Sequence, residues 1–457
     1  MRFPRRAFIR HLSSGCTAAG LGPSLALAAQ LGGGHPLAPQ PTHFKPQAKR
    51  LLFIFLTGGF SHIDTFDPKP KLVQDHGKTV TAPAETGKLQ LMGSPFRFRK
   101  CGESGLSISE LFPHLQSIAD DLCVIRSMNS DIVEHFQATL AMHTGSATVP
   151  MPSIGAWLSY GLGTFNANLP SFVVLAEHTT YAGAQVWDNN FLPPYHRGVR
   201  IRPAVKPIEN LESPARTGEL RELELQMLRD VNQSHAAARP GDLNLRGRMS
   251  STDIATGLMQ EAPHAFDLSD ETDRTLECYG CARGERKSFA WQCLMARRFL
   301  ERGVRVLELI DTGSHDNWDS HTDIQDHRPK ARRVDRPITA LIRDLKQRGL
   351  FSDTVICICT EFGRTPWRDG EMSTGRNHHA RCFTCLLTGA GIKTGMTYGA
   401  TDEYGAEITE NPCHVHDYHA TLLHLLGIDH TNLTYRYGGR DFRLTDVAGN
   451  VVRDILA

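Results

Sequence analysis

The sequence predicts an α/β fold in which a mainly parallel sheet carries helices on both faces and a helical insertion interrupts the middle of the chain. Short apolar runs recur along the chain, and segments with helical periodicity separate them. Continuous apolar runs of this length are typical of strands buried on both faces, and strands alternating with helices form parallel sheets. The runs predicted as strands are 50–57, 122–126, 172–175, 304–310, 354–360 and 383–387.

Helices are predicted between these runs. The clearest has an apolar face at helical spacing and ends at Gly349, a residue typical of helix C-termini. That face is formed by Ala331, Val334, Ile338, Leu341, Ile342 and Leu345. The other predicted helices are about 109–121, 135–143, 153–162, 220–235, 287–302 and 416–426. Residues 194–282 are charged and lack convincing strands, so they are interpreted as a helical insertion in a single domain spanning 50–457.

Composition narrows the function classes. The 457 residues include 50 Lys and Arg against 49 Asp and Glu, for a formal net charge of +1. This balance provides no overall field for polyanions, so no nucleic-acid partner is expected. The chain also contains 22 His, the residue that most often binds metals and carries protons near neutral pH. The composition therefore favours a metal or acid–base site.

The N-terminus has the features of an export signal. A twin-arginine pair, Arg5-Arg6, precedes a weakly apolar stretch and a small-x-small cleavage signature at Ala26-Leu27-Ala28. Residues 1–29 are therefore predicted to be a signal peptide read by the twin-arginine export machinery, followed by a flexible leader over 30–49. No later segment has the ~18–20 apolar residues of a membrane span. We expect a periplasmic or secreted protein with no membrane span in the mature chain.

The cysteines leave several possibilities open. Loss of Cys16 with the signal leaves ten cysteines, an even number that is compatible with disulfides in an exported chain. The pair Cys278 and Cys281 is compatible with a short-range disulfide, half a metal site or a redox centre. Cys357 and Cys359 lie in an apolar run and are interpreted as buried strand residues.

Histidine and acidic residues gather just after three of the predicted strands. Because ligand clefts of such sheets lie at the carboxyl ends of the strands, these loops are expected to meet. Their oxygen and nitrogen ligands suit divalent ions, among them zinc, manganese and calcium. The candidate metal ligands are His62, Asp64, Asp311, His315, Asp319, His321, Glu361 and His378.

Longer motifs around these residues point to a family. They include Asn-Trp-Asp-Ser-His over 317–321, Glu-Phe-Gly-Arg-Thr-Pro over 361–366 and Gly-Arg-Asn-His-His over 375–379. With them the sequence resembles a bacterial domain-of-unknown-function family, number 1501, which is sulfatase-like and belongs to the alkaline-phosphatase superfamily. Further segments that carry the resemblance are 58–70, 109–115, 152–163, 296–305 and 398–403.

The resemblance implies a one-metal or two-metal site that hydrolyses phosphate or sulfate esters. Asp311-x-x-x-His315 matches the metal-ligand spacing of the superfamily, whereas Asp319-x-His321 belongs to the family's own pattern and is preferred here. Glu361 keeps the carboxylate of the superfamily's Asp-His-Gly motif. His378 resembles its last metal-binding histidine.

The expected nucleophile is replaced. Counting back from the Thr-Gly pair that follows the sulfatase nucleophile leads to His135, which cannot act in that way; it is predicted instead to be a general base. Arg364 and Arg376 suit a bidentate grip on sulfate or phosphate. The sequence thus predicts an exported, metal-dependent hydrolase acting on a small-molecule or polysaccharide ester. The alternative is a non-catalytic periplasmic or cell-surface binding protein, because Thr57 also replaces the strand-end aspartate.

Overall fold

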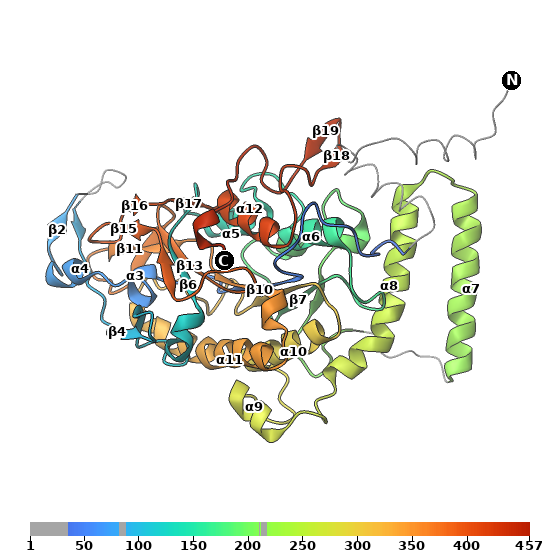
Figure 1. Cartoon of the computed structure of the whole chain (residues 1–457), viewed down its shortest axis with the longest axis horizontal. Helices are drawn as coiled ribbons and strands as arrows, with labels where there is room; N and C mark the ends of the chain where they lie inside the picture. Colours follow the sequence, from blue (N-terminus) through green and yellow to red (C-terminus); the bar gives the residue numbers. More distant parts are fainter. Residues whose placement is uncertain (1–34, 82–87, 210, 212–216) are drawn as a thin grey trace.

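A computed structural model of the chain describes residues 35–81, 88–209, 211 and 217–457, so the predicted signal peptide at 1–29 lies outside the described residues. A mixed α/β architecture surrounds one central sheet (Figure 1). The strands of this sheet are β1 (Arg50–Phe55), β6 (Cys123–Asn129), β7 (Phe172–Ala176), β8 (Val199–Ile201), β9 (Val306–Ile310), β10 (Thr354–Cys359), β13 (Phe383–Gly389), β14 (Met396–Tyr398) and β17 (Cys413–His414).

The sheet is mostly parallel. Its strand order is β14-β6-β13-β10-β1-β9-β7-β8, with β17 also paired to β6. Strand β13 runs antiparallel to its neighbours β10 and β6, whereas β1 pairs in parallel with both β10 and β9. The predicted fold class is therefore confirmed, and the carboxyl ends of β1, β6, β7, β9 and β10 share one edge.

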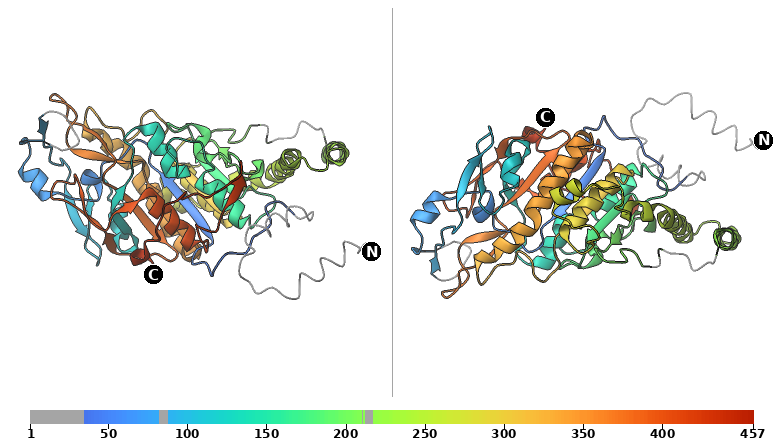
Figure 2. Two further views of the ribbon diagram at one scale, coloured as in Figure 1. Left: turned by 90° about the horizontal axis from the view of Figure 1, so that it is seen from above. Right: turned by 90° about the horizontal axis from the view of Figure 1, so that it is seen from below.

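Helices cover both faces because β1 alternates its side chains between two cores. Leu52 and Ile54 belong to the core beneath α10 (Phe289–Glu301) and α11 (His327–Gln347). Leu51, Phe53 and Phe55 belong to the core beneath three helices on the opposite face (Figure 2). Those helices are α5 (His135–Thr144), α6 (Ile154–Leu162) and α12 (Val415–Leu425).

The predicted insertion over 194–282 is helical but also supplies an edge strand. It contains α7 (Gly218–Ala237), α8 (Leu243–Phe266) and α9 (Asp273–Tyr279), and α7 and α8 stand side by side at one end of the molecule (Figure 1). Strand β8 was missed because its three residues are too few to produce a hydrophobic pattern. The helix predicted at 109–121 is wrong: a strand ends at Ser109 and a 3-10 helix begins at Leu115, because Pro113 disfavours a continuous helix.

Shorter elements lie around the main sheet. Two short helices follow β1, namely α3 (His62–Thr65) and α4 (Pro70–Gln74). The two-stranded ribbons are β2 (Thr79–Val80) with β3 (Leu89–Gln90), β4 (Phe98–Cys101) with β5 (Leu106–Ser109), β11 (Gly363–Arg368) with β12 (Arg376–His379), β15 (Ala400–Thr401) with β16 (Ile408–Glu410), and β18 (Tyr435–Tyr437) with β19 (Arg440–Phe442).

The segment before β1 is attached to the body. Leu37 is fully buried, and its carbonyl accepts a hydrogen bond from the Thr164 backbone at 2.8 Å. The backbones of Gln47 and Ala48 both donate to the Leu425 carbonyl. Residues 35–49 thus lie along the domain, in contrast to the flexible leader that the sequence predicted. Across the described ranges, no helix has the length and apolar character that crossing a membrane requires.

The ten cysteines of the described residues are free thiols, and all except Cys278 are buried. Burial raises the pKa of the Cys281 thiol to about 11, so this side chain stays protonated near neutral pH. Within the described part of the chain, the group of side chains that could hold a metal contains no cysteine. The Cys278–Cys281 pair thus forms neither a disulfide nor part of that group.

Candidate metal centre

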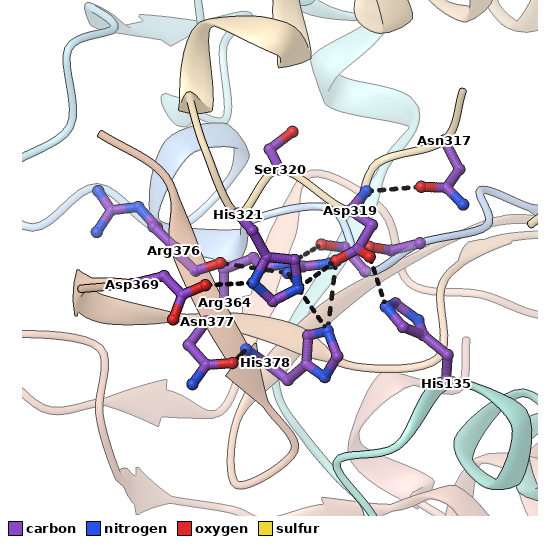
Figure 3. A network of polar contacts seen from close by, with 12 residues as sticks. His135, Asn317, Asp319, Ser320, His321, Arg364, Asp369, Arg376, Asn377 and His378 are labelled. Carbon is purple, nitrogen blue, oxygen red and sulfur yellow. Dashed lines mark hydrogen bonds and ion pairs between the residues drawn. The ribbon is translucent and has the colours of Figure 1, made fainter. Parts of the chain in front are cut away.

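Four side chains from three parts of the chain meet at the carboxyl edge of the sheet (Figure 3). His135 opens α5 after β6, Asp319 and His321 lie in the loop after β9, and His378 lies on β12. The ribbon of β11 and β12 brings His378 to the site by pairing it with Arg364. One ligand atom from each of the four side chains lies within 4.8 Å of the others. We call these four residues the His/Asp cluster.

In each of the three histidines, Nδ1 lies within hydrogen-bond distance of an oxygen that can only accept a hydrogen bond. Nδ1 must therefore carry the proton in the neutral ring, which leaves a lone pair on Nε2. Histidines that bind metals are typically oriented by such a contact. The three contacts are His135 to Glu361 Oε1 at 2.8 Å, His321 to Asp369 Oδ2 at 2.5 Å and His378 to the Val133 carbonyl at 2.7 Å.

The three Nε2 atoms converge on one carboxylate. Those of His321 and His378 lie 2.9 Å apart, and they lie 2.8 and 3.3 Å from Asp319 Oδ1. His135 Nε2 lies 3.2 Å from the other oxygen, Oδ2. Lone pairs so close together repel unless a proton or a metal ion lies between them. Imidazole nitrogens with a carboxylate form a donor set that suits zinc, and the residues therefore fit a divalent ion.

Glu361 supports the cluster from within the protein. It is fully buried at the end of β10 and accepts hydrogen bonds from the Gly58 backbone at 2.8 Å and from Thr360 Oγ1 at 2.9 Å. Gly58 has a φ of +111°, and a Cβ there would lie 2.6 Å from the Trp318 backbone nitrogen. Only glycine tolerates both conditions. The Thr57-Gly58-Gly59 segment thus lets the loop after β1 approach the loop that carries Asp319.

Arg364 binds the Asp319 carboxylate of the cluster and does not point its guanidinium toward an open face of the site. Its guanidinium is fully buried, and the acceptors around it match its five N–H donors. These acceptors are the carbonyls of Gly58, Gly59 and Arg376, Asp319 Oδ1 at 2.6 Å and His321 Nε2 at 3.4 Å. With every donor engaged, the predicted grip on substrate would require Arg364 to release one of these partners.

The electrostatics of the cluster favour a bound cation. Burial alone would lower the pKa of His135, but hydrogen bonds to Asp319 and Glu361 raise it to about 9. The hydrogen bond to Asp319 also raises the pKa of His321. Burial disfavours the charged form of Asp319, yet hydrogen bonds from the three histidines keep its pKa well below the usual range. In the metal-free protein at neutral pH, His135 is therefore an imidazolium between two carboxylates.

Metal binding is expected to release about one proton from His135 at pH 7, because the cation and the proton compete for the same region. Because the pKa of His135 is raised, the apparent metal affinity should increase with pH. His135 is protonated below pH 9 without metal, so apparent affinity should rise about tenfold per pH unit up to about 9. Calorimetric titration of zinc in two buffers of different ionisation enthalpy measures the released protons. Identical heats in both buffers would contradict the competition.

Tyr181 and Asp369 are parts of this site that sequence reasoning missed. The Tyr181 ring stacks on His135 with centroids 4.1 Å apart, and its hydroxyl lies 3.5 Å from Asp319 Oδ2. Asn317 Nδ2 donates to the same hydroxyl at 2.7 Å. Tyr181 follows β7 in a loop that begins with Glu177-His178, so an acid and a histidine at this strand end were a signal that sequence reasoning did not use. Asp369 is separated from His321 in the chain and meets it only through folding.

Three of the predicted site residues lie away from the cluster, in the packed layer beside it. His62 is fully buried, and its Nε2 lies 3.0 Å from the Gly405 carbonyl. Asp64 forms an ion pair with Arg376, whose Nε lies 2.6 Å from Oδ2, and both side chains are fully buried. Asp64 is thus neutralised by Arg376, which in turn does not face the site. These residues fix the loop after β1 to the β11–β12 ribbon.

The alternative metal pair is also separated from the cluster. Asp311 accepts hydrogen bonds from Trp318 Nε1 and Arg333 Nε, each at 3.0 Å. His315 is exposed in a neighbouring cleft. Of the two pairs that the sequence left open, the structure therefore brings Asp319 and His321 to the cluster, and not Asp311 and His315.

A family model described as "Protein of unknown function (DUF1501)" matches residues 48–456, nearly the whole described chain. The chain belongs to this family. The match begins just before β1 and ends in the C-terminal segment, so it includes every residue of the His/Asp cluster. The resemblance read from the motifs is therefore confirmed. No curated protein matches the sequence significantly.

Three solved structures are distantly similar to the chain. A protein in the alkaline phosphatase superfamily from Vibrio parahaemolyticus has a TM-score of 0.39 and 11% identity, covering 90% of this chain and 76% of its own. The lipoteichoic acid synthase LtaP from Listeria monocytogenes has a TM-score of 0.38 and 10% identity, with coverages of 89% and 78%. The zinc complex of the C-terminal periplasmic domain of EcEptC from Escherichia coli has a TM-score of 0.36 and 11% identity, with coverages of 85% and 86%. At these TM-scores the similarities do not bear on the assignments below.

Proposed function

We propose that the protein binds one divalent ion at the His/Asp cluster and hydrolyses a sulfate or phosphate ester there. The observation that supports this most strongly is the convergence of three imidazole Nε2 atoms on Asp319, with each Nδ1 held by a hydrogen-bond acceptor. The Nε2 atoms of His321 and His378 lie 2.9 Å apart, close enough to share one proton or to bind one ion. The family resemblance in the motifs points to the same reaction class.

The distances suggest a division of roles within the cluster. Asp319 Oδ1, His321 Nε2 and His378 Nε2 form the tightest group, with separations of 2.8, 2.9 and 3.3 Å. We assign these three atoms as metal ligands. Catalytic zinc sites typically have three protein ligands and keep a fourth position open. A divalent ion held there would polarise an ester oxygen and lower the pKa of water.

His135 is assigned as the general base. Its Nε2 faces the other oxygen of Asp319, and its Nδ1 donates to Glu361, which fixes the tautomer. A positive charge at the three ligands lowers the pKa of His135 from its metal-free value of about 9 and frees Nε2 to accept a proton. Glu361 stabilises the imidazolium that results. Tyr181 stays protonated because burial raises its pKa, so its hydroxyl is available as a donor to substrate oxygen.

His135→Ala is expected to lower turnover by about 10²–10⁴-fold while metal content stays unchanged, because it removes the proton acceptor but none of the three proposed metal ligands. The measurement is metal-dependent hydrolysis of 4-nitrophenyl sulfate, 4-nitrophenyl phosphate and a sulfated oligosaccharide with zinc, manganese or calcium supplied. His235→Ala is the matched control, since this exposed histidine lies outside both the cluster and the cleft at the ends of β7, β8 and β9.

Turnover that survives in His135→Ala would remove the general-base assignment. Absence of turnover on every ester by the metal-loaded wild type would instead favour a binding protein on the same scaffold. That second candidate is motivated by His135 itself, which occupies the start of α5 in place of a hydroxyl or thiol nucleophile.

A further inference from the structure

A cleft of about 1190 Å³ opens at the carboxyl ends of β7, β8 and β9. Glu177 follows β7, Arg202 follows β8 and Asp311 follows β9, and all three line it. The metal-ligand candidates of the His/Asp cluster are not among its lining residues. Its cationic lining residues are Arg200, Arg202, Lys206, Lys287 and Arg333.

The charges of this cleft are unevenly neutralised. Arg333 is paired with Asp311 at 3.0 Å and with Asp316 at 3.3 Å. Arg202 and Lys287 are exposed, and among the described residues no carboxylate lies within ion-pair distance of either. The same holds for Lys206, within the same described ranges.

Two further carboxylates line the cleft, namely Glu177 and Glu209. Both are exposed, and with Asp311 and Asp316 included the cleft has five cationic and four acidic lining residues, so its formal charge is +1. Arg200 donates to the carbonyls of Ala176 and Glu177, so its charge is held at the rim without a neutralising partner. His178 and His315 add further donors on the same walls. An anion entering the cleft therefore meets positive charge that the protein does not neutralise itself.

A buried hydroxyl in the cleft also lacks a partner. Thr312 is only 7% exposed, lines the cleft directly after Asp311, and its Oγ1 makes no hydrogen bond to any described residue. Most buried polar groups in proteins have a hydrogen-bond partner, so an unpaired one indicates a place for a ligand atom. A ligand oxygen can provide that partner, independently of the charge argument.

The cleft lies next to the metal centre. His178 and Thr179 line the cleft, and Tyr181, two residues further on, stacks on His135. Asn317 Nδ2 bridges the two regions, because it donates to the Gly313 carbonyl at 3.2 Å and to the Tyr181 hydroxyl at 2.7 Å. The two regions are therefore adjacent, linked by residues 178–181 and by the Asn317 side chain.

We infer that this cleft binds sulfate or phosphate groups next to the one that is hydrolysed, so that the substrate is an extended polyanion rather than a small monoester. The inference rests on the proposed function for its reaction but not for its binding site. Formal net charge is only +1, so the attraction is local to the cleft and does not extend over the whole surface. Sulfated polysaccharide and polyphosphate share the required chemistry.

The test measures binding of fluorescent dextran sulfate, uncharged dextran and polyphosphate to the full chain. We expect dextran sulfate, polyphosphate or both to bind and dextran not to bind; the ratio of the two affinities identifies the source. The triple variant Arg202→Gln, Lys206→Gln, Lys287→Gln should bind about tenfold or more weakly. The matched control neutralises three exposed cations outside the cleft, Lys45→Gln, Arg274→Gln and Lys393→Gln, and should bind as wild type.

The binding experiment is repeated in Asp319→Asn, which should lose metal. Polyanion binding that persists in this variant, with no turnover of any ester by wild type, would leave the cleft intact and remove the proposed reaction. Turnover of small esters without polyanion binding would do the reverse. Equal weakening in the cleft and control triples, or equal binding of dextran and dextran sulfate, would overturn the inference.

Discussion

Replacing His378 with alanine is expected to weaken zinc binding by at least about 100-fold. The substitution removes one of the three proposed ligands, and losing even the residues that orient a ligand costs about 10–100-fold. Its Nε2 lies 2.9 Å from that of His321, while its Nδ1 is tied to the Val133 carbonyl. Although the His378 side chain contacts the buried Phe362 ring, with centroids 4.6 Å apart, it is itself partly exposed, so the fold should persist. Competition with a zinc chelator of known affinity measures the effect.

His315→Ala is the informative control for that measurement. His315 belongs to the pair that matches the superfamily spacing in the sequence, yet it is exposed and lies outside the His/Asp cluster. It should leave the zinc affinity unchanged. Weakened zinc binding in His315→Ala, together with wild-type zinc binding in His378→Ala, would place the metal at Asp311 and His315. That result would contradict the proposed site.

Arg376→Met is expected to destabilise the protein by about 3–5 kcal/mol, because it leaves the fully buried Asp64 carboxylate without its counter-ion. Arg376 Nε lies 2.6 Å from Asp64 Oδ2, and Nη1 donates to the Thr365 carbonyl at 3.1 Å. Ser61 Oγ donates to Asp64 at 2.5 Å but brings no charge. Urea unfolding followed by circular dichroism gives the change in the free energy of unfolding.

The double variant Asp64→Asn, Arg376→Met separates the ion pair from other effects. Removing both charges should recover part of the lost stability, since no buried charge is then left alone. A change below about 1 kcal/mol in Arg376→Met, accompanied by a raised KM, would restore the substrate-binding role that the sequence predicted for Arg376.

The main sheet could be predicted because its strands are buried on both faces. Runs such as 50–57 and 354–360 read as continuous apolar segments, and they pair in register as β1 and β10. Strand β8 escaped because Val199–Ile201 is short and its middle residue, Arg200, is charged. Edge strands of this kind are defined by the neighbour they pair with, here β7, and not by their own pattern.

The candidate site was only partly predictable for a related reason. Both Asp311 and Asp319 follow the same strand, so their positions in the sequence make them equally good candidate metal ligands. Only the conformation of the folded loop shows that Asp319, and not Asp311, lies in the cluster. The indole Nε1 of Trp318 donates a hydrogen bond to Asp311, while the next residue, Asp319, lies in the cluster. In the same way, the guanidinium of Arg376 is suited to binding an anionic substrate. Inside the protein, however, it forms an ion pair with Asp64, which is far from it in sequence. Side-chain chemistry is visible in a sequence, whereas such pairing is a tertiary property.

The central claim is that the His/Asp cluster binds a divalent ion. Its most direct test is anomalous diffraction at the zinc edge from crystals of the zinc-loaded full chain. We expect one strong peak about 2.0–2.1 Å from His321 Nε2 and His378 Nε2, with Asp319 Oδ1 as the third ligand. A peak at Asp311 and His315 or at Cys278 and Cys281, or no peak in well-ordered crystals, would contradict it.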